Sequence, residues 1–473
     1  MDVRLLIDFG STYTKILAID LERELLLGRA QALTTVDSDI TIGLKNAYST
    51  LLDECEFQER DIRGRYASSS AAGGLRIAAI GLVPALTLEA ARRAALGAGA
   101  KVVCAYGFEI DETIVAEVEA AACDIVLLTG GTDGGDKDVI LHNARMLADS
   151  ALACPILVAG NRVVATQVKE ILQAKGKSVS VTQNVLPRLD AVEVEPAQGL
   201  IRDIFIARII EAKGLSGARD FVGGEIVPTP KATLKAAALL ADGTDGEPGI
   251  GSLVIIEVGG ATTNIHSVCS GTPADPLTVV KGLPEPRVKR TVEGDLGIRY
   301  NAHTIYELAG EEPCRAKLQA IHPSLAQESI DLGTHVRALS ENVGFVPTST
   351  LEYDVDIMLA ESATGVAMQR HAGTLREEYS AVGAYKVQYG KNLLDVENLI
   401  GTGGIFKYGY RPERVLAAAQ FSLSTPWSLM PRVPKTYVDS EYFLYGIGLL
   451  ADHFPEQALR IAKKYLRPTQ RDE

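Results

Sequence analysis

Residues 5–20, LLIDFGSTYTKILAID, place an acid, a glycine and several hydroxyls between two apolar stretches. This pattern predicts a β-hairpin with a small polar turn and Asp8 at its mouth. Free backbone N–H groups in such a turn bind anions, and Gly10 would let a phosphate approach closely. Mg²⁺ prefers a few carboxylates and substrate phosphates, so Asp8 could hold it through water. On this stretch alone, an ordinary surface hairpin is an equally good interpretation.

A second stretch of the same kind, SLVIIEVGGATTNIHSV, occupies residues 252–268. Its acid, glycines and hydroxyls match those of the first stretch: Glu257 matches Asp8, Gly259 or Gly260 matches Gly10, and Thr262 and Thr263 match Ser11 and Thr12. Two such hairpins, about half a chain apart, predict a pair of duplicated domains that face each other across a cleft. Each hairpin would hold one side of a phosphate chain, and the two acids would flank one Mg²⁺.

A third glycine-rich stretch, LIGTGGIF, covers residues 399–406 and predicts a strand that runs into a turn. Gly401, Gly403 and Gly404 lack a Cβ, so a flat ring or a phosphate could lie against the backbone there. A loop that caps a helix is the alternative, because G-x-G-G by itself is a weak signal.

The length of 473 residues predicts two or more domains, and the alternation of short apolar strands with amphipathic helices predicts α/β layers. The loop ADGTDGEPGIG at 241–251 is the best candidate boundary. We therefore expect a first lobe at residues 1–245 and a second lobe at residues 246–473.

The formal net charge of −13 argues against a general nucleic-acid binder. The longest apolar run, IAAIGLVPALTL, is too short to span a bilayer, so we expect no membrane partner. No signal peptide opens the chain, and the six cysteines are scattered without a C-x-x-C pair. These features predict reduced thiols and a cytoplasmic location.

The order of the two hairpins and the Gly-Gly turn resembles the superfamily of actin-like ATPases, heat-shock chaperone ATPases and sugar kinases. The resemblance implies an α/β protein of two ribonuclease-H-like lobes, the actin-like ATPase fold, with a nucleotide cleft between them. It implies ATP and Mg²⁺ as cofactors, with Asp8 and Glu257 as catalytic and metal-associated acids. The implied phosphate ligands are Gly10, Ser11, Thr12 and Lys15 in the first hairpin and Gly259, Gly260, Thr262 and Thr263 in the second, with Gly403 and Gly404 against the adenosine.

Three longer stretches narrow the resemblance: ASSSAAGGLRIAAIGLVPALT (67–87), LLTGGTDGGDKDVILHNARMLA (127–148) and KRTVEGDLGIRYNA (289–302). They closely resemble the glutamate mutase accessory protein family, called MutL or GlmL, which is unrelated to the mismatch-repair protein of the same name. The resemblance implies an ATP-dependent, chaperone-like reactivating factor. Its partner would be an adenosylcobalamin-dependent mutase of the glutamate mutase or aminomutase type, from which it would exchange damaged cobalamin.

Two positions depart from the superfamily pattern, which usually has an aspartate at the position of Glu257 and an acid at that of Asn264. We therefore expect ATP binding with slow hydrolysis. Asp133, in TGGTDGGDKD, could position water or metal as a catalytic residue, or belong to a plain strand-to-helix turn. A small-molecule kinase with Asp133 as its base and an actin-like scaffold are the competing functions.

Overall fold

The computed structural model describes the chain except for residues 11–12, 35–38, 70–75, 99, 190, 212–214, 324–330, 381–382 and 470–473. The chain divides into two compact units, residues 1–232 with 282–284 and residues 233–281 with 285–473. The division falls within helix α8 (Thr229–Asp242), ahead of the glycine-rich loop expected as the boundary. Helix α8 begins directly after a strand of the first unit. Lys235 of this helix forms an ion pair with Asp452, and both residues belong to the second unit.

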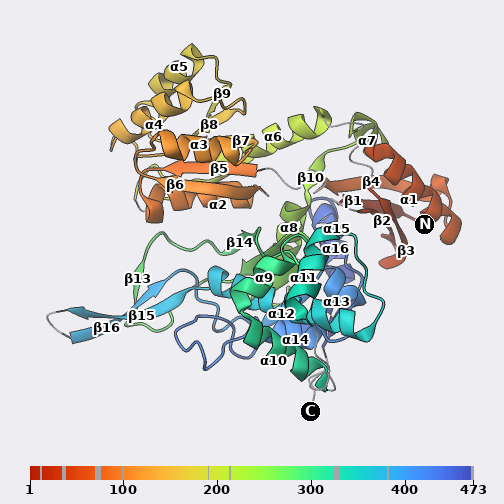
Figure 1. The fold of residues 1–473 in the computed structure, drawn as a ribbon. Helices are drawn as coiled ribbons and strands as arrows, with labels where there is room; N and C mark the ends of the chain where they lie inside the picture. The colour runs from red at the N-terminus through yellow and green to blue at the C-terminus, as the bar shows by residue number, and fades with distance from the viewer. Residues whose placement is uncertain are drawn as a thin grey trace. The chain divides into compact units, whose positions relative to one another are not determined.

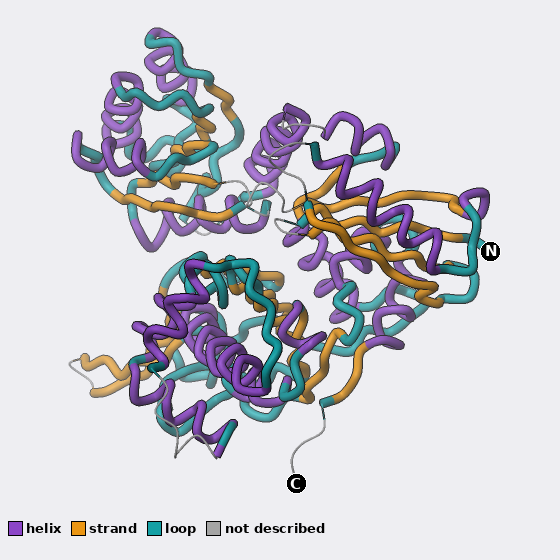
Figure 2. Tube along the Cα trace, turned by 45° about the vertical axis from the view of Figure 1, so that its right-hand side comes forward, coloured by secondary structure: helices purple, strands orange, loops and turns teal. Residues whose placement is uncertain are grey.

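The first unit contains a five-stranded sheet in the order β10-β4-β1-β2-β3. Strands β1, β2 and β3 form an antiparallel meander beside the N-terminus, while β4 pairs in parallel with both β1 and β10 (Figure 2). Helix α1 packs on β2 and β3. The bounds are β1 Val3–Phe9, β2 Tyr13–Asp20, β3 Leu25–Leu33, β4 Ile62–Ser69, β10 Ile226–Pro228 and α1 Ile40–Glu54. This strand order and these directions are those of a ribonuclease-H-like sheet.

A second, wholly parallel sheet is inserted between β4 and β10, in the order β6-β5-β7-β8-β9 (Figure 1). Its core packs buried strand residues against α3, α4 and α5. The bounds are β5 Arg76–Gly81, β6 Lys101–Gly107, β7 Ile125–Leu128, β8 Ile156–Val158, β9 Val179–Val181, α2 Glu89–Gly97, α3 Glu112–Ala120, α4 Asp138–Asp149 and α5 Ala165–Ala174. Helices α6 (Glu195–Glu211) and α7 (Leu215–Val222) lead on toward β10. We call residues 76–186 the inserted domain.

The second unit repeats the ribonuclease-H-like order in the sheet β14-β12-β11-β17-β18-β19. Strands β11, β12 and β14 are antiparallel neighbours, β17 and β18 follow in parallel with β11, and β19 closes the edge in the antiparallel direction. The bounds are β11 Leu253–Val258, β12 Thr263–Val268, β14 Val288–Glu293, β17 Asn398–Thr402, β18 Lys435–Asp439 and β19 Leu466–Pro468. The two units therefore carry the same sheet topology.

The long helix α12 packs on β11, β12 and β14 and forms the centre of a helical layer. Ser349 and Glu352 begin this helix with a capping box, which satisfies backbone donors at its first turn. Its buried carboxylate Asp356 accepts two hydrogen bonds from Arg299, at 2.7 and 2.6 Å. The helices of this unit are α9 Ala302–Ala309, α10 Glu311–Ile321, α11 Leu332–Glu341, α12 Thr350–His371, α13 Gly404–Tyr408, α14 Pro412–Ala417, α15 Leu444–Leu450 and α16 Pro455–Tyr465.

A small sheet of β13 (Val279–Lys281), β16 (Gly383–Tyr389) and β15 (Thr374–Ser380) extends from this unit (Figure 1). Its root is fixed by Lys391, a fully buried lysine that donates to Ser267 Oγ at 3.1 Å and to the Arg287 carbonyl at 2.7 Å. His371 Nε2 lies 2.8 Å from the same Ser267 hydroxyl. An ammonium can only donate, so the Ser267 hydroxyl donates to His371, and both ends of the β15–β16 hairpin are thereby tied to β12.

The α/β class expected from the sequence is confirmed, with ribonuclease-H-like sheets in both units. Among the described helices, none combines the length and apolar character that crossing a bilayer requires.

Two glycines of the loop after β7 offer a matched stability test. Gly131 (φ 70°) and Gly134 (φ 81°) both occupy the left-handed region, but a Cβ on Gly131 would overlap the Asp136 carbonyl oxygen while Gly134 has open space. We expect Gly134→Ala to lower the free energy of unfolding by about 1 kcal/mol, from backbone strain alone. Gly131→Ala should cost about 3 kcal/mol or more, because steric overlap is added. Urea unfolding of both variants measures this, and equal losses would show that the overlap at Asp136 adds no cost.

Candidate functional site

Asp8 is the buried acid at the carboxyl end of β1. Its Oδ1 accepts hydrogen bonds from the hydroxyls of Ser68 at 3.1 Å and Thr229 at 2.6 Å, while its Oδ2 lies 3.6 Å from Lys15 Nζ. Ser68 lies near the end of β4, and Thr229 directly follows β10. The parallel strands β1, β4 and β10 therefore bring their carboxyl ends together around one carboxylate. Lys15 was expected from the sequence to lie here, whereas Ser68 and Thr229 were missed.

The turn after Asp8 is tight. The Gly10 N–H donates to the Tyr13 carbonyl at 3.1 Å, and a Cβ on Gly10 would lie 2.6 Å from that oxygen. Glycine is therefore required at this position by the turn itself. Ser11 and Thr12, expected to contact phosphate, lie outside the described residues.

The second hairpin, β11–β12, repeats this geometry. Its Glu257 pairs across the strands with Asn264, as Asp8 pairs with Lys15. The Gly259 N–H donates to the Thr262 carbonyl at 3.0 Å, which is the same hydrogen bond, from a glycine to the third residue after it, as that of Gly10. The match between the two stretches predicted from the sequence thus extends to backbone hydrogen bonds.

Glu257 is held by polar side chains of the neighbouring strands. Its Oε2 accepts from Asn264 Nδ2 at 3.1 Å and lies 3.5 Å from His266 Nε2, and Arg290 Nη2 donates to Asn264 Oδ1 at 3.2 Å. Burial opposes ionisation of Glu257, but His266, Arg290 and Asn264 outweigh it and lower the pKa of the carboxyl. Burial lowers the pKa of His266, although Glu257 opposes this, and burial lowers the pKa of Arg290 to about 10. Alternation along β12 could have indicated His266, which follows Asn264 by two residues.

The carbonyls of the second turn are fixed by the stretch that follows β14. The backbone N–H groups of Ile298 and Arg299 donate to the carbonyls of Gly259 and Gly260, at 3.1 and 2.9 Å. The Thr263 hydroxyl donates to the Leu296 carbonyl at 2.6 Å, so this predicted phosphate ligand has a structural partner. These bonds leave Gly260 with ordinary space above its Cα, where the nearest atoms to a Cβ belong to Arg299 at 3.6 Å. The unusual VEGDLGIR stretch therefore positions the turn.

The Gly403–Gly404 turn adjoins the second hairpin, because β17 pairs in parallel with β11 and places Thr402 opposite Glu257. Gly403 has φ 109°, and a Cβ there would lie 2.6 Å from the Val258 carbonyl oxygen. Gly404 begins α13, and the nearest atom to a Cβ on it is 4.0 Å away. Gly403 thus allows close approach of two strands, and Gly404 leaves the turn open on its other side.

Asp439 is a buried acid at the carboxyl end of β18 that sequence reasoning missed. Its Oδ2 accepts from the Thr402 hydroxyl at 2.8 Å and from the backbone N–H groups of Phe443 and Leu444 at 2.8 and 3.1 Å. Burial raises the pKa of Asp439 to about 6, although these hydrogen bonds oppose the rise. The carboxyl therefore joins the end of β17, just before the Gly403–Gly404 turn, to the start of α15.

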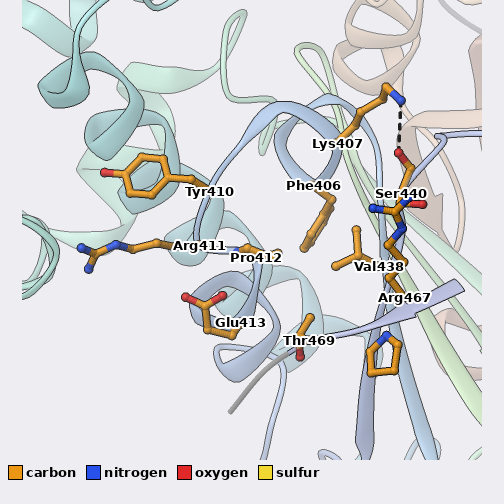
Figure 3. Close-up of a pocket in the computed structure, with 11 residues that line it drawn as sticks. Phe406, Lys407, Tyr410, Arg411, Pro412, Glu413, Val438, Ser440, Arg467 and Thr469 are labelled. Atoms are coloured by element: carbon orange, nitrogen blue, oxygen red, sulfur yellow. Dashed lines mark hydrogen bonds between the residues drawn. The ribbon is translucent and has the colours of Figure 1, made fainter. Parts of the chain in front are cut away.

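A cavity of about 650 Å³ lies beside α13, with Phe406 and Lys407 of this helix in its lining (Figure 3). Lys407 closes one side, where its Nζ donates to the Ser440 carbonyl and to Glu441, each at 3.1 Å. The lining residues are Phe406, Lys407, Tyr410, Arg411, Pro412, Glu413, Val438, Ser440, Arg467, Pro468 and Thr469. A molecule in this cavity would contact the same short helix that Gly404 begins.

Asp133 lies in the inserted domain, on a different sheet from Asp8 and Glu257. Its Oδ1 accepts from the Arg162 backbone N–H and from Asn184 Nδ2, each at 2.9 Å, and its Oδ2 accepts from Arg162 Nε at 3.3 Å. Burial opposes ionisation, but these donors lower the pKa of the carboxyl. The carboxylate holds neighbouring loops together, and its role in chemistry stays a prediction.

Two ribonuclease-H-like sheets, each opened by an acid–glycine hairpin, place the chain in the class of proteins with the actin-like ATPase fold. A family model described as MutL protein matches residues 4–466. Protein MutL of Clostridium tetanomorphum is 46% identical over 466 residues, which are 98% of this chain and 99% of that protein. The chain belongs to the MutL family, and the resemblance inferred from the sequence is confirmed.

Solved structures give weaker likenesses. The activator of the 2-hydroxyisocaproyl-CoA dehydratase from Clostridium difficile, with bound ADPNP, is 9% identical with a TM-score of 0.33, over 99% of this chain and 100% of that one. A ligand-bound xylulose kinase from Lactobacillus acidophilus is 12% identical with a TM-score of 0.36, and the match covers 99% of this chain and 93% of that one. At such scores these likenesses carry no argument about the site.

The raised pKa of Asp439 makes stability depend on pH. A carboxyl with a folded pKa of about 6 and an ordinary value of 3.8 favours the folded state fully below pH 3.8, and that contribution is lost as pH rises through 6. Asp439→Asn cannot ionise, so it should gain about 3 kcal/mol over wild type at pH 8, since each pKa unit is worth about 1.4 kcal/mol. Urea unfolding between pH 4 and pH 8 measures the difference, with the exposed Asp395→Asn as control. A constant difference across this range would contradict the raised pKa.

Proposed function

We propose that this chain is an ATP-dependent accessory factor that reactivates an adenosylcobalamin-dependent mutase of the glutamate mutase or aminomutase type. It would exchange damaged cobalamin in that partner protein. Binding of ATP and slow hydrolysis of ATP would drive this exchange. Membership of the MutL family supports this role. The nucleotide part of the proposal rests on the repeated hairpin, in which a buried or nearly buried acid precedes a glycine whose N–H donates to the carbonyl of the third residue after it.

The residues of the two hairpins fit a nucleotide with Mg²⁺. Asp8 and Glu257 each offer one carboxylate, and Mg²⁺ is usually bound by one or two carboxylates together with phosphates and water. Within the described ranges there is no group of three or more His, Cys, Asp or Glu residues that would hold a metal alone. When bound, Mg²⁺ would neutralise developing charge on the phosphates. The glycine turns would supply backbone N–H groups to phosphate oxygens.

Slow turnover is consistent with the surroundings of Glu257. Asn264, which donates to Glu257, is an amide and cannot act as a base, and His266, whose Nε2 lies 3.5 Å from Glu257, is fully buried and so does not reach bulk water. Phosphoryl transfer to water needs positioning and charge neutralisation more than covalent chemistry. A factor that acts through its nucleotide-bound state does not need fast ATP hydrolysis, because contacts to the γ-phosphate can hold one conformation of the protein until the ATP is hydrolysed.

The environment of Asp133 disfavours a small-molecule kinase. A kinase base must accept a proton from the substrate hydroxyl, and Asp133 was the only candidate that the sequence offered. Arg162 and Asn184 occupy its oxygens and lower its pKa, which makes the carboxylate a weaker base. A cytoplasmic location is part of the proposal, and all six cysteines are free thiols in the structure.

Loss of the first acid tests nucleotide binding. Asp8→Ala removes the carboxylate that Ser68 and Thr229 surround, so Mg²⁺-dependent ATP affinity should fall about 100-fold, which corresponds to about 3 kcal/mol. Calorimetric titration with ATP and ADP, with and without Mg²⁺, measures this. Asp2→Asn is the matched control, because Asp2 pairs with Arg4 on the same sheet. Unchanged ATP binding by Asp8→Ala would remove this hairpin from the proposed site.

The second acid should affect hydrolysis more than affinity. Glu257→Gln keeps the side-chain length but removes the charge, so Mg²⁺-dependent hydrolysis should fall about tenfold or more, which is at least about 1.4 kcal/mol of transition-state stabilisation. ATP affinity measured without Mg²⁺ should stay the same. Phosphate release and calorimetry give the two quantities, and equal hydrolysis by both proteins would contradict a role for Glu257.

Reactivation itself is tested with a mutase inactivated by damaged cobalamin. Addition of this chain with ATP, Mg²⁺ and fresh adenosylcobalamin should restore mutase activity, and the Asp8→Ala chain should not. If ATP binds with Mg²⁺ dependence but no mutase of this type is restored, the nucleotide site stands and the reactivating role is wrong.

A further inference from the structure

The loops at the carboxyl edge of the inserted sheet are tied together by three buried asparagines. Asn143, on α4, accepts from the Ile110 N–H and donates to the Phe108 carbonyl, each at 3.0 Å. It therefore joins the loop after β6 to the helix that follows β7. Its side chain is fully buried, and both ends of the amide are satisfied.

The other two asparagines lie in the loops after β8 and β9, and both form hydrogen bonds with the loop after β7. Asn161, after β8, accepts from the Gly134 N–H at 3.1 Å and donates to the Asp136 carbonyl at 2.8 Å. Asn184, after β9, donates to the Gly131 carbonyl at 3.0 Å. Four successive loops of one sheet edge are thereby fixed to one another. A surface that is rigid before binding loses less entropy when a partner binds.

Phe108 is exposed on this edge in a strained conformation. It has φ 68°, a region that bulky side chains rarely occupy, and its side chain is 60% exposed. Burial of the ring offsets only part of this strain, because most of the side chain is exposed. Strain of this kind is kept where function requires it. Val163, after β8 on the same edge, is 55% exposed and adds a second apolar side chain.

The loops after β6, β7 and β8 carry an excess of negative charge, while the loop after β9 contributes the exposed cation Arg188. Their exposed carboxylates are Glu109, Asp111 and Glu112 after β6 and Asp136 and Asp138 after β7. The exposed cations described in the loops after β6, β7 and β8 are Lys137 and Arg162, and Arg162 is already paired with Asp133 at 3.3 Å. The edge therefore offers an apolar anchor within an acidic rim, and a complementary protein would present an apolar pocket within a basic rim.

We propose that the carboxyl edge of the inserted domain is the docking surface for the protein partner, with Phe108 as its anchor. The partner surface has an apolar pocket for the phenyl ring and Lys or Arg side chains around it. This inference rests on the proposed function only in taking the partner to be the mutase. Aromatic anchors in a desolvated pocket carry a large share of binding energy in protein interfaces.

The test measures binding of the full chain to a purified mutase of the glutamate mutase type by calorimetry. Phe108→Ala should weaken binding at least tenfold, and Tyr379→Ala, which removes an exposed aromatic from β15, should not. Glu109→Lys with Glu112→Lys should weaken binding and reduce its dependence on salt. ATP titration of each variant should match wild type. Wild-type binding that Phe108→Ala leaves unchanged would overturn the docking surface while the proposed function stands.

A second measurement is independent of the mutase. Glycine adopts φ 68° without strain, so Phe108→Gly should leave Tm unchanged or raise it if the phenyl ring serves binding. A clear fall in Tm would show that Phe108 serves stability, and would overturn the proposal. If wild type binds no mutase at all, the proposed function fails and the docking surface fails with it as a mutase site. The ATP titrations and the Tm of Phe108→Gly separate that result from a misfolded protein.

Discussion

The hydrogen bonds that Asp8 accepts from Ser68 and Thr229 show the constraint on which the candidate site depends. Parallel strands of one sheet end at the same edge, so residues more than 200 positions apart in the chain meet at one carboxylate. The second sheet obeys the same rule, where Thr402 at the end of β17 donates to Asp439 at the end of β18. A change in strand register would therefore remove several partners of each acid together.

The predictions that the structure confirms came from local sequence patterns. An acid two residues before a glycine, between apolar strands, predicted both hairpins, and in both the glycine N–H donates to the carbonyl of the third residue after it. Partners set by strand pairing could not be predicted this way. Ser68 and Thr229 lie in stretches to which the sequence assigned no chemistry, and Arg290 reaches Asn264 only because β14 pairs with β12. The sequence contains the alternation of these strands but does not state which strand lies beside which.

The glycines show a second limit of sequence reasoning. In the loop TGGTDGG, which contains the candidate Asp133, a side chain on Gly131 would overlap the backbone of its own loop at Asp136. Gly403 likewise approaches the carbonyl of Val258. Glycine permits close approach whatever the approaching group is, and the sequence alone does not distinguish a ligand from a neighbouring strand. The alternation of strands and helices indicated α/β layers, but it did not separate the inserted parallel sheet from the sheet that surrounds it.

The acids that follow or end the strands of this chain fall into two groups, one buried and one exposed. Asp8 and Asp439 are buried and accept hydrogen bonds from hydroxyl or backbone donors, so their positions are fixed to within the reach of those bonds. Such acids suit chemistry that depends on geometry, as at a phosphate chain. Glu109, next to Phe108 in the chain, and Asp136, in the loop after β7, are exposed, and in the proposed docking surface they add negative charge around an apolar anchor. Exposed charges of this kind govern the rate and choice of association more than its strength. The proposed nucleotide chemistry and the proposed partner recognition have different physical requirements, but both would use residues gathered at the carboxyl edge of parallel strands.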